Sequence, residues 1–594
     1  MVCQVKCVIF KYICYIFKCT NTEIMYIIKL RGSDNMIYSS IEKINGVPRL
    51  LVNGEPIPDN AYITYMPENA RYNDFSEVGY KLFSVTVHFS TRCISEMNEY
   101  PPFAPGIFEN EIPDFSILDA TISQILDVCP DAMIFPRVNT ALPLRWEIEN
   151  PDELCDRGNV NPNKRRPCFA SDKWAEEVKK YLGMFLDYVD KSFYRDNIIG
   201  YQLADGNSCE WFPYDLDGSK GKRSREKFAE FSKMKNIEGT EEEYYAFISR
   251  LTADRICEFA EFVKNKTDHR LIVGSFYGYT FDVPTRGWAT FSLSSILNNE
   301  NIDFLCSPIS YMNNRALGMD NPNMMAIESL KEHNKLYFVE NDTRTHLTKP
   351  LFDVPHFHNE YWEAKDIRCA LENIKQHYAR ALTHSHALWW FDMGGGWYHY
   401  SAYMNMMRDF LEITKKSLKK NMSGISEVAL IADEKVVPEV HNNQLHTVHE
   451  TLSRGRINLG LMGTPYDTYL SEDYDIIKHK YKAFIILSPY LTKDLKKITD
   501  TNKNCLAITY ENHGITTDEL REFLRKNNVH IYSDKDAVIY ANKSYFFIHT
   551  TQVGKAEIKM PKGKKLKQIY GDEIDIESDI LPKHTGYLFE ITEE

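Results

Sequence analysis

The sequence predicts an α/β protein whose main domain is a (β/α)8 TIM barrel, followed by a smaller α/β domain and a C-terminal antiparallel β domain. Short, near-continuous apolar runs alternate with helical patterns, as in parallel strands that are covered by helices. Eight such units over about 360 residues fit a barrel enlarged by loops. The expected strands are residues 61–65, 83–89, 132–138, 198–204, 271–276, 302–307, 336–340 and 387–391.

Helical periodicity fills the intervals between these runs. After a Ser171 start, Trp174 and Val178 begin an apolar face, and the Thr-Glu-Glu-Glu segment 240–243 has the capping-box pattern of a helix start. An open, doubly wound sheet is the alternative architecture. No Gly-x-Gly-x-x-Gly segment follows any of the runs, so a dinucleotide site has little support.

The domain boundaries follow from changes in this pattern. We expect residues 36–420 to form the barrel with an N-terminal β-hairpin, whose Asn-Gly turn at residues 53–54 precedes the first barrel strand. This hairpin is expected to close the bottom of the barrel. Residues 425–533 repeat a shorter α/β pattern, and residues 534–594 form several short strands separated by turn residues.

Residues 1–35 are apolar but interrupted by lysines too often for a membrane span or a signal h-region. We expect a non-native or disordered extension, with Met36 or Met25 as the natural start. A weak signal anchor is the alternative.

Composition and charge narrow the class of partner. The 594-residue chain carries a net charge of −13, which would repel phosphate backbones and argues against nucleic acid as a partner. Its 13 cysteines are odd in number and include no Cys-x-x-Cys pair, so we expect a reducing, cytoplasmic location and no zinc knuckle. The aromatic content of 13% suits a protein that stacks on sugar rings. No membrane partner is expected.

Two glutamates stand just past expected strands: Glu210 follows the fourth run, and Glu340 ends the seventh. In a parallel barrel both would face the same mouth. Glycoside hydrolysis needs an acid that protonates the leaving oxygen and a carboxylate that attacks or stabilises the sugar centre, about 5 Å apart in retaining enzymes. We therefore assign Glu210 as acid/base and Glu340 as nucleophile.

Three charged residues bear on this pair and are expected to line the substrate site. Arg137 ends the third run and Arg344 follows Glu340, so each could keep the Glu340 carboxylate ionised. A surface ion pair is the alternative for either arginine. Asp342 stands two residues beyond Glu340 and would point the same way in extended chain, so spacing leaves it open as the nucleophile.

Three segments carry a resemblance to a known group. Ile198-Ile-Gly-Tyr-Gln-Leu-Ala-Asp-Gly-Asn-Ser-Cys-Glu-Trp-Phe212 resembles the acid/base segment of clan A glycoside hydrolases, most closely the family 42 β-galactosidases. Leu336-Tyr-Phe-Val-Glu-Asn-Asp-Thr-Arg-Thr-His346 resembles their nucleophile segment. Leu388-Trp-Trp-Phe-Asp-Met-Gly-Gly-Gly-Trp397 is similar to their eighth strand, which carries a Trp that floors the sugar site. The resemblance implies that residues 425–533 form an amidotransferase-like domain associated with trimer formation, hence a homotrimer.

The acid/base segment departs from that group at one position. The group usually places Asn directly before the acid/base Glu, where it contacts the sugar 2-hydroxyl, and this chain has Cys209 there. Asn207 could substitute through a longer turn. The departure weakens the assignment of galactose as the sugar, and the cysteine cluster that holds zinc in many family 42 enzymes has no counterpart here.

Aromatic residues near the mouth are candidate stacking platforms, with the protein core as the alternative position for each. They are Trp211, Tyr277, Tyr279, Trp389, Trp390 and Trp397. Strand alternation turns one residue of the Trp389-Trp390 pair inward and the other outward.

We therefore predict a retaining, exo-acting β-glycosidase that hydrolyses terminal β-linked sugars from a β-glycoside or oligosaccharide, with β-galactosidase as the first substrate hypothesis. A catalytically silent carbohydrate-binding barrel is the alternative from another class, and an inverting hydrolase is a third possibility. No cofactor is expected. No metal is expected either, because His446-x-x-His449 lacks a third ligand of suitable spacing.

Overall fold

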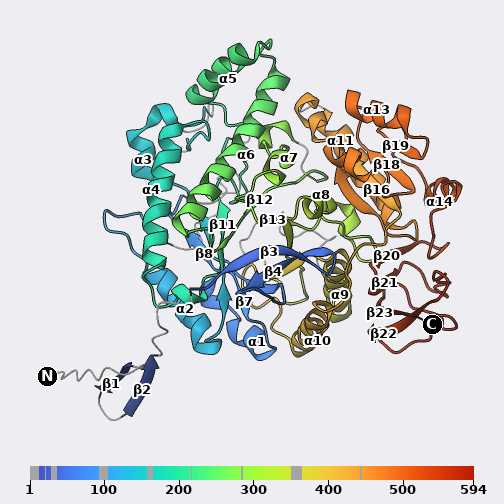
Figure 1. Cartoon of the computed structure of the whole chain (residues 1–594), viewed down its shortest axis with the longest axis horizontal. Coiled ribbons are helices and arrows are strands. Elements are labelled where there is room, and N and C mark those ends of the chain that lie inside the picture. Colours follow the sequence, from blue (N-terminus) through green and yellow to red (C-terminus); the bar gives the residue numbers. More distant parts are fainter. Residues whose placement is uncertain are drawn as a thin grey trace.

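The computed structural model describes residues 13–19, 22–28, 36–92, 105–156, 165–215, 217–282, 285–349, 364–441 and 444–593. Figure 1 shows the barrel in blue to yellow, the smaller α/β domain in orange and the C-terminal sheet in red.

Parallel strands form the barrel. In chain order they are β6 (Asn60–Ile63), β7 with β8 (Leu82–Phe83, Thr86–His88), β9 with β10 (Met133–Ile134, Arg137–Asn139), β11 (Gly200–Ala204), β12 (Ile272–Phe276), β13 (Phe304–Pro308), β14 (Leu336–Asn341) and β15 (Ala387–Phe391). The second and third strands are each split in two. β15 pairs with β6, β6 with β7, and β7 with β9, while Ile134 bridges to Ile198 just before β11. The sheet therefore closes, which confirms the predicted barrel and excludes the open sheet.

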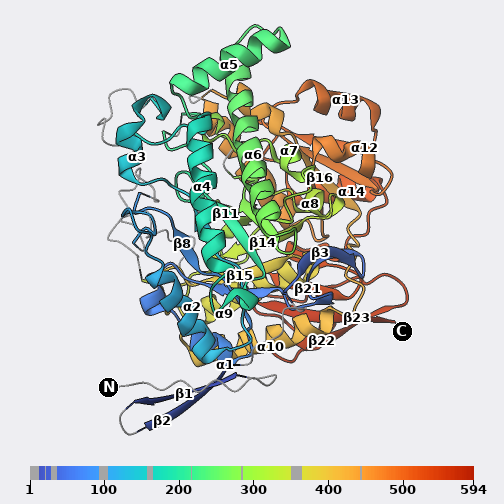
Figure 2. The same cartoon turned by 60° about the vertical axis from the view of Figure 1, so that its left-hand side comes forward.

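Helices cover the outside of the barrel. They include α1 (Tyr72–Glu77), α2 (Ser116–Val128), α4 (Asp172–Val189), α6 (Glu241–Lys266), α7 (Leu293–Leu297), α8 (Ile327–Glu332), α9 (Ile367–His384) and α10 (Ser401–Ser417). Ser171 caps α4 by accepting a hydrogen bond from the backbone of Trp174, and Thr240 and Glu243 form the capping box of α6. The two helices lie side by side in Figure 2. None of the described helices is long and apolar enough to span a membrane.

An antiparallel sheet lies under the barrel. It comprises β3 (Ser39–Ile44), β4 (Val47–Val52) and β5 (Glu55–Pro56), with Asn53 and Gly54 at positive φ in the turn. The Ser39 N–H donates to the Arg270 carbonyl at 2.8 Å, and Ser39 Oγ accepts from the Ile272 N–H at 2.9 Å. Because Ile272 begins β12 and Arg270 precedes it, the sheet closes the end of the barrel opposite the mouth.

A separate antiparallel hairpin precedes this sheet. It pairs β1 (Ile13–Cys19) with β2 (Thr22–Ile28). Whether residues 1–35 belong to the native protein stays a prediction.

The domain after the barrel is built on a parallel sheet in the order β17 (Asp467–Leu470), β16 (Val428–Ala432), β18 (Ala483–Leu487) and β19 (Cys505–Ile508). Its helices include α11 (Leu445–Gly460), α13 (Lys493–Thr501) and α14 (Thr517–Lys526). The sequence pattern had missed β17, a four-residue strand that begins with a buried aspartate. The predicted smaller α/β domain is confirmed.

The C-terminal sheet is antiparallel, as expected. Its order is β20 (Ala537–Ala541), β21 (Tyr545–Thr550), β23 (Gly586–Glu593) and β22 (Lys564–Tyr570). The sheet contacts α9 of the barrel through β20, β21 and β23.

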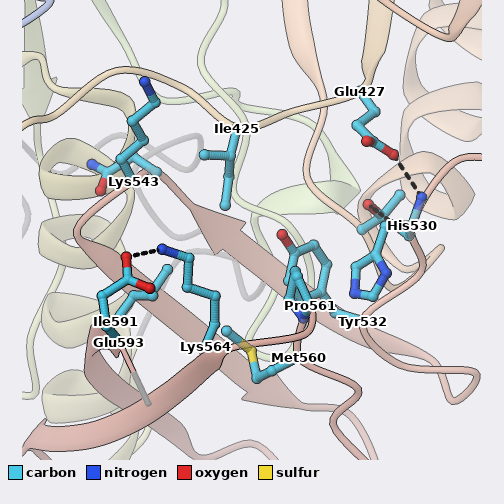
Figure 3. Close-up of a pocket in the computed structure, with 12 residues that line it drawn as sticks. Ile425, Glu427, His530, Tyr532, Lys543, Met560, Pro561, Lys564, Ile591 and Glu593 are labelled. Atoms are coloured by element: carbon cyan, nitrogen blue, oxygen red, sulfur yellow. Dashed lines mark hydrogen bonds and ion pairs between the residues drawn. The ribbon is translucent and has the colours of Figure 1, made fainter.

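A cavity of about 560 Å³ opens between the α/β domain and the C-terminal sheet (Figure 3). Its wall includes Ile425, Tyr532, Met560, Pro561 and Ile591. Two charged wall residues already have partners: Glu427 accepts from the His530 N–H at 2.7 Å, and Lys564 pairs with Glu593. None of the predicted site residues lines this cavity, so the candidate site lies elsewhere.

Candidate active site at the barrel mouth

Glu210 lies in a tight loop after β11. The Asn207 N–H donates to the Phe212 carbonyl at 2.8 Å and closes the loop around Glu210. Left-handed φ values of 58°, 64° and 63° occur at Ser208, Cys209 and Trp211. A non-glycine residue in this region costs of order 1–3 kcal/mol, and such strain is typical of functional loops that the surrounding fold holds in place.

A phenol holds the Glu210 side chain. Tyr279, which follows β12, donates its hydroxyl to Glu210 Oε1 at 2.8 Å. Burial, followed by the nearby charge of Glu340, raises the pKa of Glu210 to about 8, and the Tyr279 hydrogen bond opposes that rise. Glu210 is therefore protonated near neutral pH, as a general acid must be.

Glu340 sits at the end of β14 with two donors. Arg137 Nη2 lies 3.0 Å and Trp389 Nε1 lies 3.3 Å from Glu340 Oε2. Burial raises the pKa of Glu340 to about 6, and the Arg137 guanidinium is the largest opposing influence. Glu340 is thus ionised where Glu210 is still protonated. Two carboxyl groups whose environments separate their pKa values have the division expected of a nucleophile and an acid.

Asp342 is engaged in other contacts. Arg315 pairs with its Oδ1, while Tyr311 donates to Oδ2 at 3.1 Å and Arg344 Nη1 lies 3.4 Å from Oδ2. Although Asp342 is buried, the two arginines hold the pKa of this carboxyl below its usual range. A carboxylate bound by two cations is a weak nucleophile, so these contacts favour Glu340 over Asp342.

Arg137, nearly fully buried, connects several strands at the mouth. Its Nε donates to Gln202 Oε1 at 3.1 Å and its Nη1 to the Tyr65 hydroxyl at 3.2 Å. The predicted contact between Arg137 and Glu340 is present. Arg344, by contrast, contacts Asp342 and lies 5.4 Å from the Trp397 ring centre.

Three predicted stacking residues lie in the core, outside this cluster. Trp211 is fully buried and donates to the Leu203 carbonyl at 3.3 Å. The Tyr277 hydroxyl accepts from the Ser292 N–H at 3.0 Å. The third is Trp390, which faces outward from the barrel and donates to the Tyr80 hydroxyl at 2.9 Å. Its neighbour Trp389 faces inward to Glu340, as strand alternation predicts.

Several residues of the cluster were missed from the sequence. No sequence pattern singles out Tyr65, Gln202 or Tyr311, and the pattern predicts that Tyr279 stacks on sugar rather than bonding Glu210. Trp288 is partly exposed and packs beside this cluster, with its ring centre 4.7 Å from the ring centre of Phe212. Most of these residues stand at or just beyond the C-terminal end of a barrel strand, which is the signal that could have found them.

Several buried polar groups have atoms without a hydrogen-bond partner among the described residues, and they include both ring nitrogens of His88 and Oδ1 of Asn207. His88 ends β8, and burial with the Arg137 charge lowers its pKa to about 4, so the ring is neutral. Cys209 is different, because its Sγ accepts from Asn139 Nδ2 at 3.0 Å and its burial raises the thiol pKa to about 12. Because Asn207 Oδ1 is buried, its contact with a sugar hydroxyl stays a prediction.

Among the described residues, Glu328, His384 and Asp467 form a group that could hold a metal ion, with ligand atoms within 4.8 Å of one another. Lys331 Nζ lies 3.1 Å from Glu328 Oε1, and the Thr468 N–H and O–H donate to Glu328 Oε2 at 2.7 and 2.9 Å. An ammonium group at this carboxylate competes with a cation. The contacts instead join α8 and α9 to β17.

No family model matches this sequence, and no curated protein matches it by sequence. Among solved structures, the β-galactosidase from the psychrophilic Marinomonas ef1 has a TM-score of 0.61 at 10% identity, covering 90% of this chain and 100% of that one. The chain has the fold of this β-galactosidase. The α-L-fucosidase isoenzyme 2 from Paenibacillus thiaminolyticus has a TM-score of 0.47 at 14% identity, covering 76% of this chain and 64% of that one. The endo-β-1,4-mannanase from Thermotoga petrophila has a TM-score of 0.35 at 13% identity, covering 63% of this chain and 81% of that one.

Proposed function

We propose that the protein is a retaining β-glycosidase that removes terminal β-linked sugars, with Glu210 as acid/base and Glu340 as nucleophile. The observation that supports this proposal is the pair of carboxyl groups at the barrel mouth. Tyr279 holds Glu210, whose pKa is raised to about 8, and Arg137 holds Glu340 ionised with a pKa of about 6.

The reaction assigns a step to each group. Glu340 attacks the anomeric carbon from the face opposite the leaving oxygen, and Glu210 transfers its proton to that oxygen as the glycosidic bond breaks. The covalent glycosyl-enzyme is then hydrolysed by water, which Glu210 deprotonates. Arg137 and the Trp389 indole N–H keep the Glu340 carboxylate oriented while its charge is used and regenerated.

The fold of the Marinomonas ef1 β-galactosidase and the resemblance of the strand-end segments make β-galactosides the first substrates to test. A panel of aryl β-glycosides identifies the sugar, and NMR of the first product anomer separates retention (β) from inversion (α). Sugar binding without any hydrolysis would instead support the catalytically silent barrel, which the thiol of Cys209 beside Glu210 favours. A homotrimer and a cytoplasmic location remain part of the proposal.

The pH profile of kcat/KM is expected to be bell-shaped. Activity should rise as Glu340 loses its proton near pH 6 and fall as Glu210 loses its proton near pH 8. Because the two groups interact, the limbs report apparent values of the pair. Initial rates on an aryl β-glycoside at low concentration measure both limbs. A profile flat from pH 5 to 9 would contradict the assignment.

Replacing Arg137 by methionine is expected to move the acidic limb to higher pH. The guanidinium is the largest influence that lowers the pKa of Glu340, so its removal leaves burial opposed mainly by the Trp389 hydrogen bond and keeps the carboxyl protonated to higher pH. Arg137→Lys keeps a positive charge and should shift the limb less. The alkaline limb, which reports Glu210, should move in the same direction but less, because Arg137 is a smaller influence on the pKa of Glu210. An acidic limb identical in Arg137→Met and the parent would exclude this role for Arg137.

A further inference from the structure

The smaller α/β domain lies against the barrel on the side that carries Tyr279. In Figure 1 the orange domain stands beside α7 and α8, and η8 (Glu434–Glu439) contacts α6. Tyr279 belongs to the segment 277–282 that follows β12, and it is the phenol that bonds Glu210. Two buried side chains of the α/β domain hold this segment, one on each side of Phe281.

The first is Arg456 on α11, which is 1% exposed. Its Nη1 lies 3.3 Å from Asp282 Oδ1, its Nη2 donates to the Asn323 carbonyl at 2.8 Å, and its guanidinium carbon lies 4.6 Å from the Phe281 ring centre. Asp282 Oδ2 in turn accepts from the Tyr311 N–H at 2.7 Å. Arg456 therefore fixes the segment that carries Tyr279. Through Asp282 it also holds the backbone of Tyr311, whose hydroxyl bonds Asp342.

The second is Glu434, which is 4% exposed. Its Oε1 accepts from the Thr280 hydroxyl at 2.8 Å, and its Oε2 accepts from the Leu293 N–H at 2.8 Å. Thr280 is the immediate neighbour of Tyr279. Burying a carboxyl group is unfavourable unless its hydrogen bonds are satisfied, so Glu434 is stable in this position only while Thr280 and Leu293 stay in place.

We propose that Arg456 and Glu434 are positioning residues: through Asp282 and Thr280 they hold Tyr279 against Glu210, so the α/β domain completes the catalytic site of the barrel. The inference rests on the proposed function, since it assigns a catalytic consequence to these contacts. The two clamps act on Thr280 and Asp282, one and three residues after Tyr279, which limits the freedom of its backbone to move. A displacement of about 1 Å in a catalytic group can cost a hundred-fold in rate.

The test compares Arg456→Met with Arg454→Met, a matched change two residues away on α11. The Arg454 side chain is 63% exposed and pairs with Glu450 on the same helix. We expect Arg456→Met to lower kcat by about ten- to a hundred-fold with a smaller change in KM. Its alkaline limb should also move to higher pH, because the Tyr279 hydrogen bond lowers the pKa of Glu210. Arg456→Lys should restore part of kcat, and Arg454→Met should match the parent.

Thr280→Val is a second variant that removes a single hydrogen bond from a partly exposed residue, so it tests the inference if Arg456→Met fails to fold. It should shift the alkaline limb in the same direction, and Tyr279→Phe should reproduce that shift. In the Tyr279→Phe background, adding Arg456→Met or Thr280→Val should change the limb less than either does alone. If Arg456→Met and Thr280→Val keep the kcat and pH profile of an active parent, the positioning role is wrong and the proposed function stands. If the parent hydrolyses no glycoside, the proposed function fails, and the inference fails with it.

Discussion

Replacing Glu340 by glycine is expected to lower kcat on an aryl β-glycoside by at least about a thousand-fold, because the covalent intermediate can no longer form. The same variant should regain turnover when azide is added. The small anion enters the space left by the side chain and attacks the anomeric carbon directly, so the product is the α-glycosyl azide. Proton NMR of that product measures the outcome.

Asp342→Gly is the matched variant, since this carboxyl group lies two residues away. Arg315 and Arg344 bind it, so its loss should impair the site without giving an azide-rescued enzyme. Rescue of Asp342→Gly with an inverted product, together with a silent Glu340→Gly, would move the nucleophile to Asp342. The contacts of Arg137 and Trp389 with Glu340 are the physical reason to expect the opposite result.

The barrel was predictable because its strands are buried on both faces. Residues 336–339 form an unbroken apolar run before Glu340, and parallel topology brings the ends of all such runs to one mouth. The placement of Glu210, Glu340 and Arg137 at that mouth follows from strand order alone. The contact between Arg137 and Glu340 joins residues of two barrel strands, whereas Glu210 reaches the mouth through the loop after β11.

The positions of the aromatic residues could not be derived in this way. Trp211 falls in a loop whose positive φ values turn its ring into the core, and no local pattern in the sequence marks that turn. The bond from Tyr279 to Glu210 joins residues 69 apart, and that from Arg456 to Asp282 joins residues 174 apart. Contacts of this range depend on how loops and domains pack, which hydrophobic periodicity does not encode.

Replacing Glu210 by glutamine is expected to slow hydrolysis in proportion to how poor the leaving group is. An alkyl β-glycoside needs a proton on its departing oxygen, so its kcat/KM should fall by about a hundred- to ten-thousand-fold. A dinitrophenyl β-glycoside leaves as a stable anion, so formation of the glycosyl-enzyme should be nearly unaffected. Rates across a series of aryl leaving groups measure this dependence.

Two further readouts distinguish loss of an acid from general damage to the site. The alkaline limb near pH 8, which reports deprotonation of Glu210, should disappear while the acidic limb near pH 6 stays. Azide should give the β-glycosyl azide, because Glu340 still forms the intermediate and the anion attacks it from the opposite face. An equal loss with every leaving group, or an α-glycosyl azide, would mean that Glu210 is not the proton donor.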